Sequence, residues 1–154
     1  MRRKDREQST EFALKTAQEC EFAVISMIDT DGRPYGVPVS TVLDGEALYF
    51  HTAKEGRKID CLRRSPAVHI VCVGAVQRAA DEFTTGYECA MIEGICTEVT
   101  DEAEKIRALR LLCEKYTPQN MDHFDRAIQA SLHRTGVYKA KIFSITGKAK
   151  ILKS

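Results

Sequence analysis

The chain has 154 residues, 44% of them hydrophobic and 29% charged. This balance is typical of one globular domain and excludes a disordered, collagenous or coiled-coil protein. The 23 basic and 22 acidic side chains leave a net charge of +1, so no global field attracts nucleic acid or an anionic membrane. No apolar run approaches the ~20 residues of a membrane span. No apolar segment follows the basic N-terminus, so we expect a cytoplasmic protein without a signal peptide.

The cysteine pattern favours free thiols. None of the six cysteines forms a C-x-x-C pair, and most lie inside apolar runs. In a cytoplasmic protein we expect them to be reduced and packed as small hydrophobic side chains. We expect no metal site, because the cysteines and the four histidines do not cluster at ligand spacing.

The N-terminal third predicts a short helix followed by strands. Residues 1–8 are too charged for a core and are expected to form a flexible arm, so the single domain spans 9–154. Ser9 or Thr10 can cap the helix. Two Asp-Gly steps, at Asp31-Gly32 and Asp44-Gly45, separate apolar runs, which predicts an antiparallel meander. The three strands of this meander are expected at 22–28, 35–43 and 47–51.

The remaining elements complete a mainly β domain. The best helix begins at Asp101, which can form a capping box with Glu104. The other expected elements are a short helix within 52–64, a strand at 67–73, a loop at 74–86, a strand at 87–99 bent near Gly94, weak helix over 119–134 and a strand at 136–145. About six strands without βαβ alternation predict a small six-stranded antiparallel barrel with helices over its ends.

The segment from His51 to Lys58 is the most informative for chemistry. A strand ends there and a short helix begins with a hydroxyl at Thr52 and three cations at Lys54, Arg57 and Lys58. Unpaired N–H groups and the positive dipole at a helix start favour an anion. The segment therefore predicts a phosphate site, although a solvated basic helix face has the same composition. The spacing is not that of a P-loop.

His51 stands directly before this segment. A histidine at a strand end can bond a ligand or move a proton near neutral pH, or it can simply be satisfied by backbone groups. Pro38 has no N–H to donate to a sheet, so a neighbouring backbone group can be left free. Hydroxyls follow at Ser40 and Thr41, and this stretch can contact a flat polar ligand.

A third segment, Gly86-Tyr87-Glu88-Cys89, begins a strand after the expected loop. Tyr87 and Glu88 can line a site, although taken alone an ordinary strand end explains them better. No activating base is near Cys89 in the sequence, so we do not expect it to be a nucleophile.

Taken together, these segments resemble the FMN-binding split-barrel superfamily of pyridoxamine 5'-phosphate oxidase. The resemblance is strongest to its flavin-nucleotide-binding branch, which includes the 5-nitroimidazole resistance (Nim) proteins. The run Phe50-His51-Thr52-Ala53-Lys54-Glu55-Gly56-Arg57-Lys58 is the most specific part of it. Weaker pieces are 1–6, 35–40, 87–94, 135–138 and 145–148.

The resemblance implies a six-stranded antiparallel split β-barrel that forms a homodimer, with FMN in two clefts between protomers. By position, the residues expected along the flavin ring are Pro38, Val39, Ser40 and Thr41. His51 and Thr52 would lie near the ring and ribityl chain, and the phosphate would be held by Lys54, Arg57 and Lys58. Tyr87, Glu88 and Cys89 would belong to the cleft, from either protomer. In the Nim proteins the histidine at the position of His51 lies beside the flavin, which makes His51 the candidate catalytic residue.

Two departures from the family pattern limit what the resemblance implies. The branch often has Ser at the position of Cys89. The pyridoxamine phosphate-binding arginines and histidine of the true oxidase have no match in the C-terminal segment, so oxidation of vitamin B6 is not expected.

Three functions therefore stay open. The leading interpretation is an FMN-dependent oxidoreductase that reduces a small electrophilic acceptor such as a nitroaromatic. Because no G-x-G-x-x-G motif is present, NAD(P)H would bind only transiently. The alternatives are a non-catalytic module that stores or carries FMN, and a haem-binding split barrel with His51, His69 or His133 as axial ligand.

Overall fold

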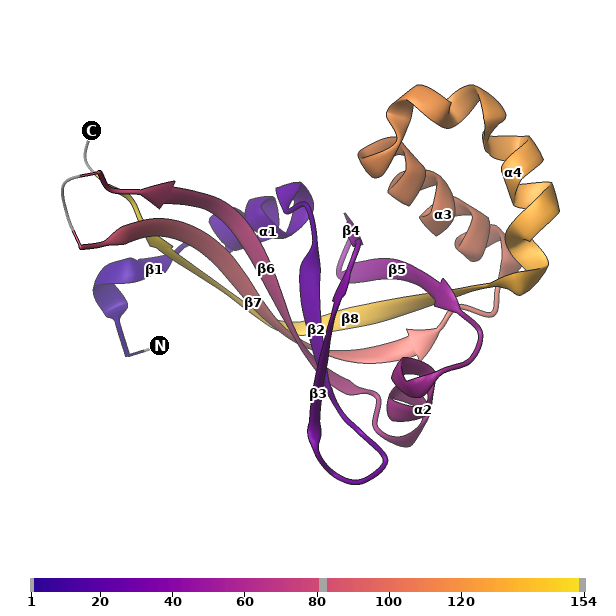
Figure 1. The fold of residues 1–154 in the computed structure, drawn as a ribbon, viewed down its shortest axis with the longest axis horizontal. Coiled ribbons are helices and arrows are strands. Elements are labelled where there is room, and N and C mark those ends of the chain that lie inside the picture. The colour runs from indigo at the N-terminus through magenta and orange to yellow at the C-terminus, as the bar shows by residue number, and fades with distance from the viewer. Residues whose placement is uncertain (1, 81–82, 153–154) are drawn as a thin grey trace.

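The computed structural model describes residues 2–80 and 83–152. One antiparallel sheet contains all the strands of this described part (Figure 1). The strands are β1 (Glu7–Gln8), β2 (Ala23–Ile28), β3 (Pro34–Val39), β4 (Val42–Asp44), β5 (Ala47–Ala53), β6 (Ala67–Arg78), β7 (Thr85–Glu98) and β8 (Thr135–Lys150). The helices are α1 (Thr10–Glu19), α2 (Arg57–Arg64), α3 (Glu102–Tyr116) and α4 (Phe124–Ser131), with short 3-10 turns at Lys4–Arg6, Pro118–His123 and Leu132–Arg134.

The order of the strands makes an open, split barrel. Hydrogen bonding runs β3-β2-β6-β7-β8-β5-β4, and β1 pairs with β8. The mainly antiparallel split-barrel prediction is confirmed, although the described sheet has eight strands and not six. The additional strands are the very short β1 and β4. Strands β3 and β4 are the two ends of the order, yet only Ser40 and Thr41 separate them in the chain.

The predicted meander is wrong in one respect. Both Asp-Gly turns exist, with positive φ at Gly32 and Gly45, and they close the hairpins β2–β3 and β4–β5. The predicted strand 35–43 is instead divided at Ser40 and Thr41. Consequently the two hairpins lie at opposite ends of the sheet order, and β5 pairs with β8.

The predicted loop at 74–86 is also wrong. Strand β6 continues to Arg78 and β7 begins at Thr85, so the two strands form a long hairpin arm (Figure 1). A β-bulge between Val73 and Val76 interrupts its register, which explains why the sequence shows no clear alternation there. The predicted bend near Gly94 is confirmed by a register shift, and a Cβ at this glycine would lie 2.5 Å from the Lys141 carbonyl oxygen.

Two hydrophobic clusters stabilise the fold. The first fills the barrel and includes Ile25, Phe50 and Ile92. The second joins α3 and α4 to the outer face of β5 through Leu109 and Phe124. Burying each such side chain contributes about 1.5–3 kcal/mol. The second cluster fixes the α3–α4 hairpin over one end of the barrel. At the other end, α1 packs against β6, β7 and β8 (Figure 1).

The predicted helix caps and the free cysteine thiols are both present in the structure. The Ser9 hydroxyl accepts from the Phe12 N–H, and the Asp101 carboxylate accepts from the Glu104 N–H. All six cysteines are free thiols. Within the predicted arm at 1–8, residues 7–8 pair with β8. None of the helices in the described residues is both long and apolar enough to cross a membrane.

Candidate functional site

Strand β5 presents its side chains alternately to two environments. Leu48 and Phe50 are fully buried in the barrel core, whereas Tyr49 packs beneath α3. Because side chains alternate along a strand, His51 shares the face of Tyr49 and Thr52 shares the face of Phe50. At the end of β5, His51 therefore lies on the face that is covered by α3, whereas Thr52 lies on the face that lines the barrel core.

The start of α2 lacks a side-chain cap. Gly56 occupies the N-cap position with φ +117°, and its carbonyl oxygen accepts from the N–H groups of Ile59 and Asp60 at 2.8 and 3.1 Å. Among the described residues, no side chain bonds the N–H groups of the first turn. A helix start in this condition carries partial positive charge and open donors, which favours an anion.

Lys58 adds a full positive charge beside this helix start. Its Nζ lies 5.5 Å from the centroid of the Phe50 ring. Burial lowers the pKa of the Lys58 ammonium, and within the described chain no carboxylate forms an ion pair with it. The ammonium is thus partly desolvated and uncompensated, so a phosphate would stabilise it.

Arg57 is held differently, by a residue that the sequence did not single out. Its guanidinium donates to Asp29 Oδ2 at 2.7 Å and stacks 4.2 Å from the Tyr35 ring centroid. The buried Asp29 also accepts from the N–H groups of Arg33 and Asp31 at 2.8 and 2.9 Å. The Arg33 bond first, and then Arg57, lower the pKa of the Asp29 carboxyl. An Asp that opens an Asp-Thr-Asp-Gly turn signals such backbone bonds, but no local pattern predicts its ion pair.

Lys54 lies apart from the other two cations. It lines a hollow of about 620 Å³ next to Lys105 and His133, on the side of the helix hairpin. Burial first, and then the charge of Lys54, lower the pKa of Lys105. The structure therefore gathers Arg57 and Lys58 at the start of α2 and leaves Lys54 outside this group.

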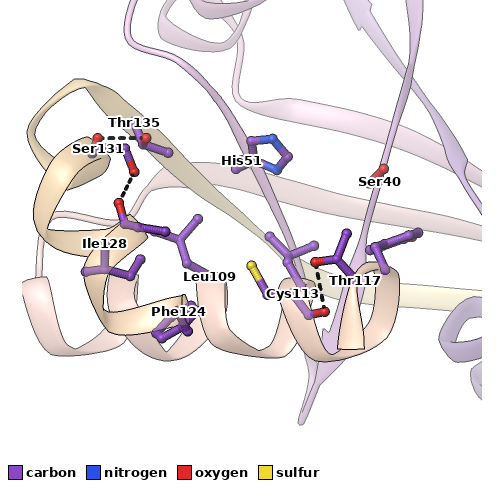
Figure 2. Close-up of a pocket in the computed structure, with 12 residues that line it drawn as sticks. Ser40, His51, Leu109, Cys113, Thr117, Phe124, Ile128, Ser131 and Thr135 are labelled. Carbon is purple, nitrogen blue, oxygen red and sulfur yellow. Dashed lines mark hydrogen bonds between the residues drawn. The ribbon is translucent and has the colours of Figure 1, made fainter. Parts of the chain in front are cut away.

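His51 opens onto a separate apolar cavity. The cavity, about 320 Å³, lies between the end of β5 and the α3–α4 hairpin. Figure 2 shows His51 and Ser40 along one side of it, with Leu109, Cys113 and Phe124 opposite. Burial first, and then the charge of Lys58, lower the pKa of His51. The imidazole is therefore neutral at pH 7 and can both donate and accept a hydrogen bond.

The segment between β3 and β4 is fastened by α3. Thr41 is fully buried, and its N–H donates to the Tyr116 hydroxyl at 3.0 Å. Its carbonyl oxygen accepts from Tyr116 at 3.0 Å and from Lys115 Nζ at 2.8 Å. Both backbone groups of Thr41 are thus occupied, and Ser40 is the hydroxyl residue of this pair that reaches the cavity. Sequence reasoning missed Tyr116 and Lys115, which lie some 75 residues away.

The neighbours Pro38 and Val39 point in different directions. Val39 is buried in the barrel core, whereas Pro38 is exposed on the edge strand β3. Edge strands are where proline is expected, because it has no N–H to donate.

The third predicted segment lies at the far end of the sheet. His51 is opposite Val137 on β8, whereas Cys89 is opposite Lys148. At about 3.3 Å per residue, this separation is roughly 36 Å of strand. Tyr87 lies still further along β7. The structure does not bring Tyr87, Glu88 and Cys89 to His51 within one chain.

Local contacts around Tyr87 involve the N-terminal segment. Arg6 donates to the Tyr87 hydroxyl at 3.2 Å, and Lys148 lies 5.6 Å from its ring centroid. These cations, Arg6 first, lower the pKa of Tyr87. Burial raises the pKa of the Cys89 thiol, which agrees with the expectation that it is not an activated nucleophile.

The sequence matches the profile of the pyridoxamine 5'-phosphate oxidase family over residues 9–149. The chain belongs to this family. The resemblance predicted from the sequence is thereby confirmed at the level of the family. No curated protein matches the sequence.

Solved structures of proteins from several bacteria share the fold of this pyridoxamine 5'-phosphate oxidase family member. A candidate 5-nitroimidazole antibiotic resistance protein from Bacteroides thetaiotaomicron is 24% identical, with a TM-score of 0.77 over 92% of this chain and 84% of that one. A FAD-binding protein from Mesorhizobium loti is 18% identical, with a TM-score of 0.68 over 95% and 98%. The FAD and haem binding protein from Mycobacterium smegmatis is 17% identical, with a TM-score of 0.77 over 93% and 72%.

In this family member, the candidate site combines a positively charged helix start with an apolar cavity at the end of β5. The start of α2 with Lys58 offers the open N–H groups and the positive charge that favour an anion, and the neutral His51 and Ser40 border the separate apolar cavity. Among the described residues, no group of three or more His, Cys, Asp or Glu side chains is arranged to hold a metal ion.

Proposed function

We propose that this chain binds FMN and uses it to reduce a small electrophilic acceptor. The observation that carries the proposal is the uncapped start of α2 with the partly desolvated Lys58 beside it. We infer that an anion binds here, directly after the strand that carries His51. The names of the structural relatives, which include two FAD-binding proteins and a candidate nitroimidazole resistance protein, support a flavin and such an acceptor.

The residues present fit FMN. Lys58 and the N–H groups of α2 would hold its phosphate, with Arg57 able to exchange its bond to Asp29 for one to phosphate. Ser40 and His51 would border the ring. When bound, the flavin supplies hydride and electron transfer, and the protein supplies binding, orientation and electrostatics.

His51 is proposed to position the flavin or the acceptor by hydrogen bonding. Its lowered pKa keeps the imidazole neutral at pH 7, so it positions a ligand by hydrogen bonding more readily than it donates a proton. The His51→Gln variant should therefore retain turnover and flavin, while His51→Ala should lose turnover and keep flavin. Loss of turnover in both variants with flavin retained would instead assign a general acid, whose removal typically costs ~10²–10⁴ in rate.

We further propose a homodimer with FMN in clefts between the protomers. Two features support it. Tyr87 and Cys89 lie too far from His51 to share one cleft within a chain, and the exposed hydrophobic side chains Phe22, Val76 and Phe143 need cover. Light scattering should give twice the 17.3 kDa of the chain. A monomer that still holds FMN stoichiometrically would remove the shared-cleft arrangement.

The absorption spectrum of freshly purified protein tests the central proposal. Flavin bands are expected, together with tighter binding of FMN than of riboflavin on reconstitution. Anaerobic bleaching by NADH or NADPH, reversed by a nitroaromatic, would show the reductase. Flavin bands without bleaching would favour a storage or carrier module, and a Soret band without flavin would replace the proposal by haem binding.

A further inference from the structure

The cavity between the end of β5 and the α3–α4 hairpin has no charged wall. Among the described residues that line it, none is Asp, Glu, Lys or Arg, and His51 is neutral at pH 7 because burial, and then the charge of Lys58, lower its pKa. Leu109, Phe124 and Ile128 supply an apolar wall on the side of the hairpin (Figure 2). A charged molecule that entered would lose its water without gaining a charged partner. The cavity therefore favours an uncharged ligand.

The hydroxyl groups on the hairpin side of the cavity are already bonded. Those of Thr117, Ser131 and Thr135 donate to main-chain carbonyl oxygens at 3.3, 2.7 and 2.9 Å, as the dashed lines in Figure 2 show. The Tyr116 hydroxyl donates to another carbonyl oxygen at 3.0 Å. These hydroxyl hydrogens are used within the fold, so this side of the cavity offers a ligand mainly apolar contacts.

Ser40 and His51 stand on the other side with their polar atoms available. Neither side chain bonds any of the other residues that line the cavity (Figure 2). The hydroxyl and the neutral imidazole can each both donate and accept a hydrogen bond. An apolar lining with a few polar groups on one side is typical of small-molecule sites, where the polar groups fix the orientation of the ligand.

The volume of the cavity limits the size of its occupant. The cavity measures about 320 Å³, whereas an apolar cavity of about 150 Å³ holds one benzene molecule. It therefore has room for one or two fused rings, and not for a three-ring flavin together with a second molecule. A flavin ring also carries several polar atoms along one edge, and the bonded hydroxyls on the hairpin side have no hydrogen to give them.

We propose that this cavity binds the electron acceptor and selects an uncharged aromatic molecule of one or two rings. The polar substituent of the acceptor bonds to His51 or Ser40, and its ring lies against Leu109 and Phe124. The flavin ring stays outside the cavity, on the side of Ser40 and His51. The role of the occupant as acceptor rests on the proposed function, whereas its charge and size follow from the cavity itself.

Equilibrium dialysis with matched probes tests this selection. The full chain, both saturated with FMN and without flavin, is dialysed against 4-nitrobenzyl alcohol or 4-nitrobenzoate, which share one ring and differ in charge. The alcohol should bind in both states and the benzoate in neither. Among larger probes, 1-nitronaphthalene should bind and 1-nitropyrene, with four fused rings, should not. Binding of the benzoate or of nitropyrene as tight as that of the alcohol would overturn the assigned class, and displacement of the alcohol by FMN would show that the flavin ring fills the cavity.

A matched pair of variants locates the bound probe. Ala127 and Ala130 are both exposed on α4, and of the two only Ala127 lines the cavity. Leucine is a good helix former at either position. Ala127→Leu fills part of the space and should abolish binding of 4-nitrobenzyl alcohol, whereas Ala130→Leu should bind it like the wild type. Unchanged binding in Ala127→Leu would refute the location.

Cys113 gives a second measure of the location in the wild-type chain. It is half-buried and lines the cavity, while Cys89 is half-buried on β7 opposite Lys148, far from His51. Bound 4-nitrobenzyl alcohol should slow the alkylation of Cys113 by iodoacetamide and leave that of Cys89 unchanged. An unchanged rate at Cys113 while the probe is bound would place the probe elsewhere. Absence of flavin from the purified protein would remove the proposed function and the acceptor role with it, without changing what dialysis shows of the cavity.

Discussion

Replacing Lys58 with Met separates a phosphate site from an ordinary basic surface. The aliphatic part of the side chain can still cover the Phe50 ring, so the main loss is the charge. A hydrogen bond to a charged group contributes about 1.5–3 kcal/mol. At 1.4 kcal/mol per tenfold change in affinity, Lys58→Met should weaken FMN binding about 10- to 150-fold. Riboflavin, which has no phosphate, should bind with unchanged affinity.

Quenching of flavin fluorescence on titration with apoprotein measures both affinities. The matched control is Lys54→Met, since Lys54 has the same charge and lies in the same segment but lines a different hollow. Its FMN affinity should stay close to that of the wild type. Equal losses for FMN and riboflavin in Lys58→Met, or equal losses of FMN in the two variants, would refute the assignment of the phosphate to the start of α2.

The same substitution should stabilise the protein without flavin. Burial lowers the pKa of Lys58 in the folded state, so its charged form opposes folding. This destabilisation is complete below the folded pKa and disappears as the pH rises past the unfolded value near 10.4. Urea unfolding at pH 7 should therefore show a higher midpoint for flavin-free Lys58→Met than for wild type. With FMN bound, the order should reverse.

Three further predictions concern the residues around the site. The NMR titration midpoint of His51 should lie below its usual value near 6.5, and it should rise in Lys58→Met because the Lys58 charge contributes to the shift. The lowered pKa of Asp29 stabilises the fold above about pH 4, and this contribution is lost as the pH falls through the folded pKa. Thermal unfolding of Asp29→Asn should accordingly vary less with pH than that of the wild type. Tyr116→Phe leaves the buried Thr41 N–H without its acceptor, and it should lower the urea-unfolding free energy by about 1–3 kcal/mol.

Local signals in the sequence were sufficient for much of the fold. Positive φ at Gly32 and Gly45 follows from the Asp-Gly turns, and the Asp101 cap follows from its spacing to Glu104. The division of the run 35–43 could not be predicted in this way. Its residues suit one strand, and the break at Thr41 depends on bonds from Tyr116, a distant residue on α3.

The candidate site shows the same limit. The sequence located His51, Arg57 and Lys58 at one strand-to-helix junction, and the structure places them there. It could not show that Arg57 is paired with Asp29, because that contact joins a helix start to a turn 28 residues away. Nor could it separate Lys54 from Lys58, since their directions depend on where α2 begins. Composition specifies the type of group, whereas tertiary contacts decide which groups share a site.

The position of β5 in the sheet has a consequence for how the protein is made. In the described sheet, β5 pairs only with β8 apart from its short partner β4, and His51 lies opposite Val137. During synthesis, β5 leaves the ribosome long before its main partner exists, and the slow search for such a non-local pairing comes last. Strands β2, β3, β6 and β7 can associate earlier through nearer neighbours. The strand that carries His51 therefore enters the sheet in the final step, so incomplete chains should hold β2, β3, β6 and β7 together while His51 is not yet fixed in the sheet.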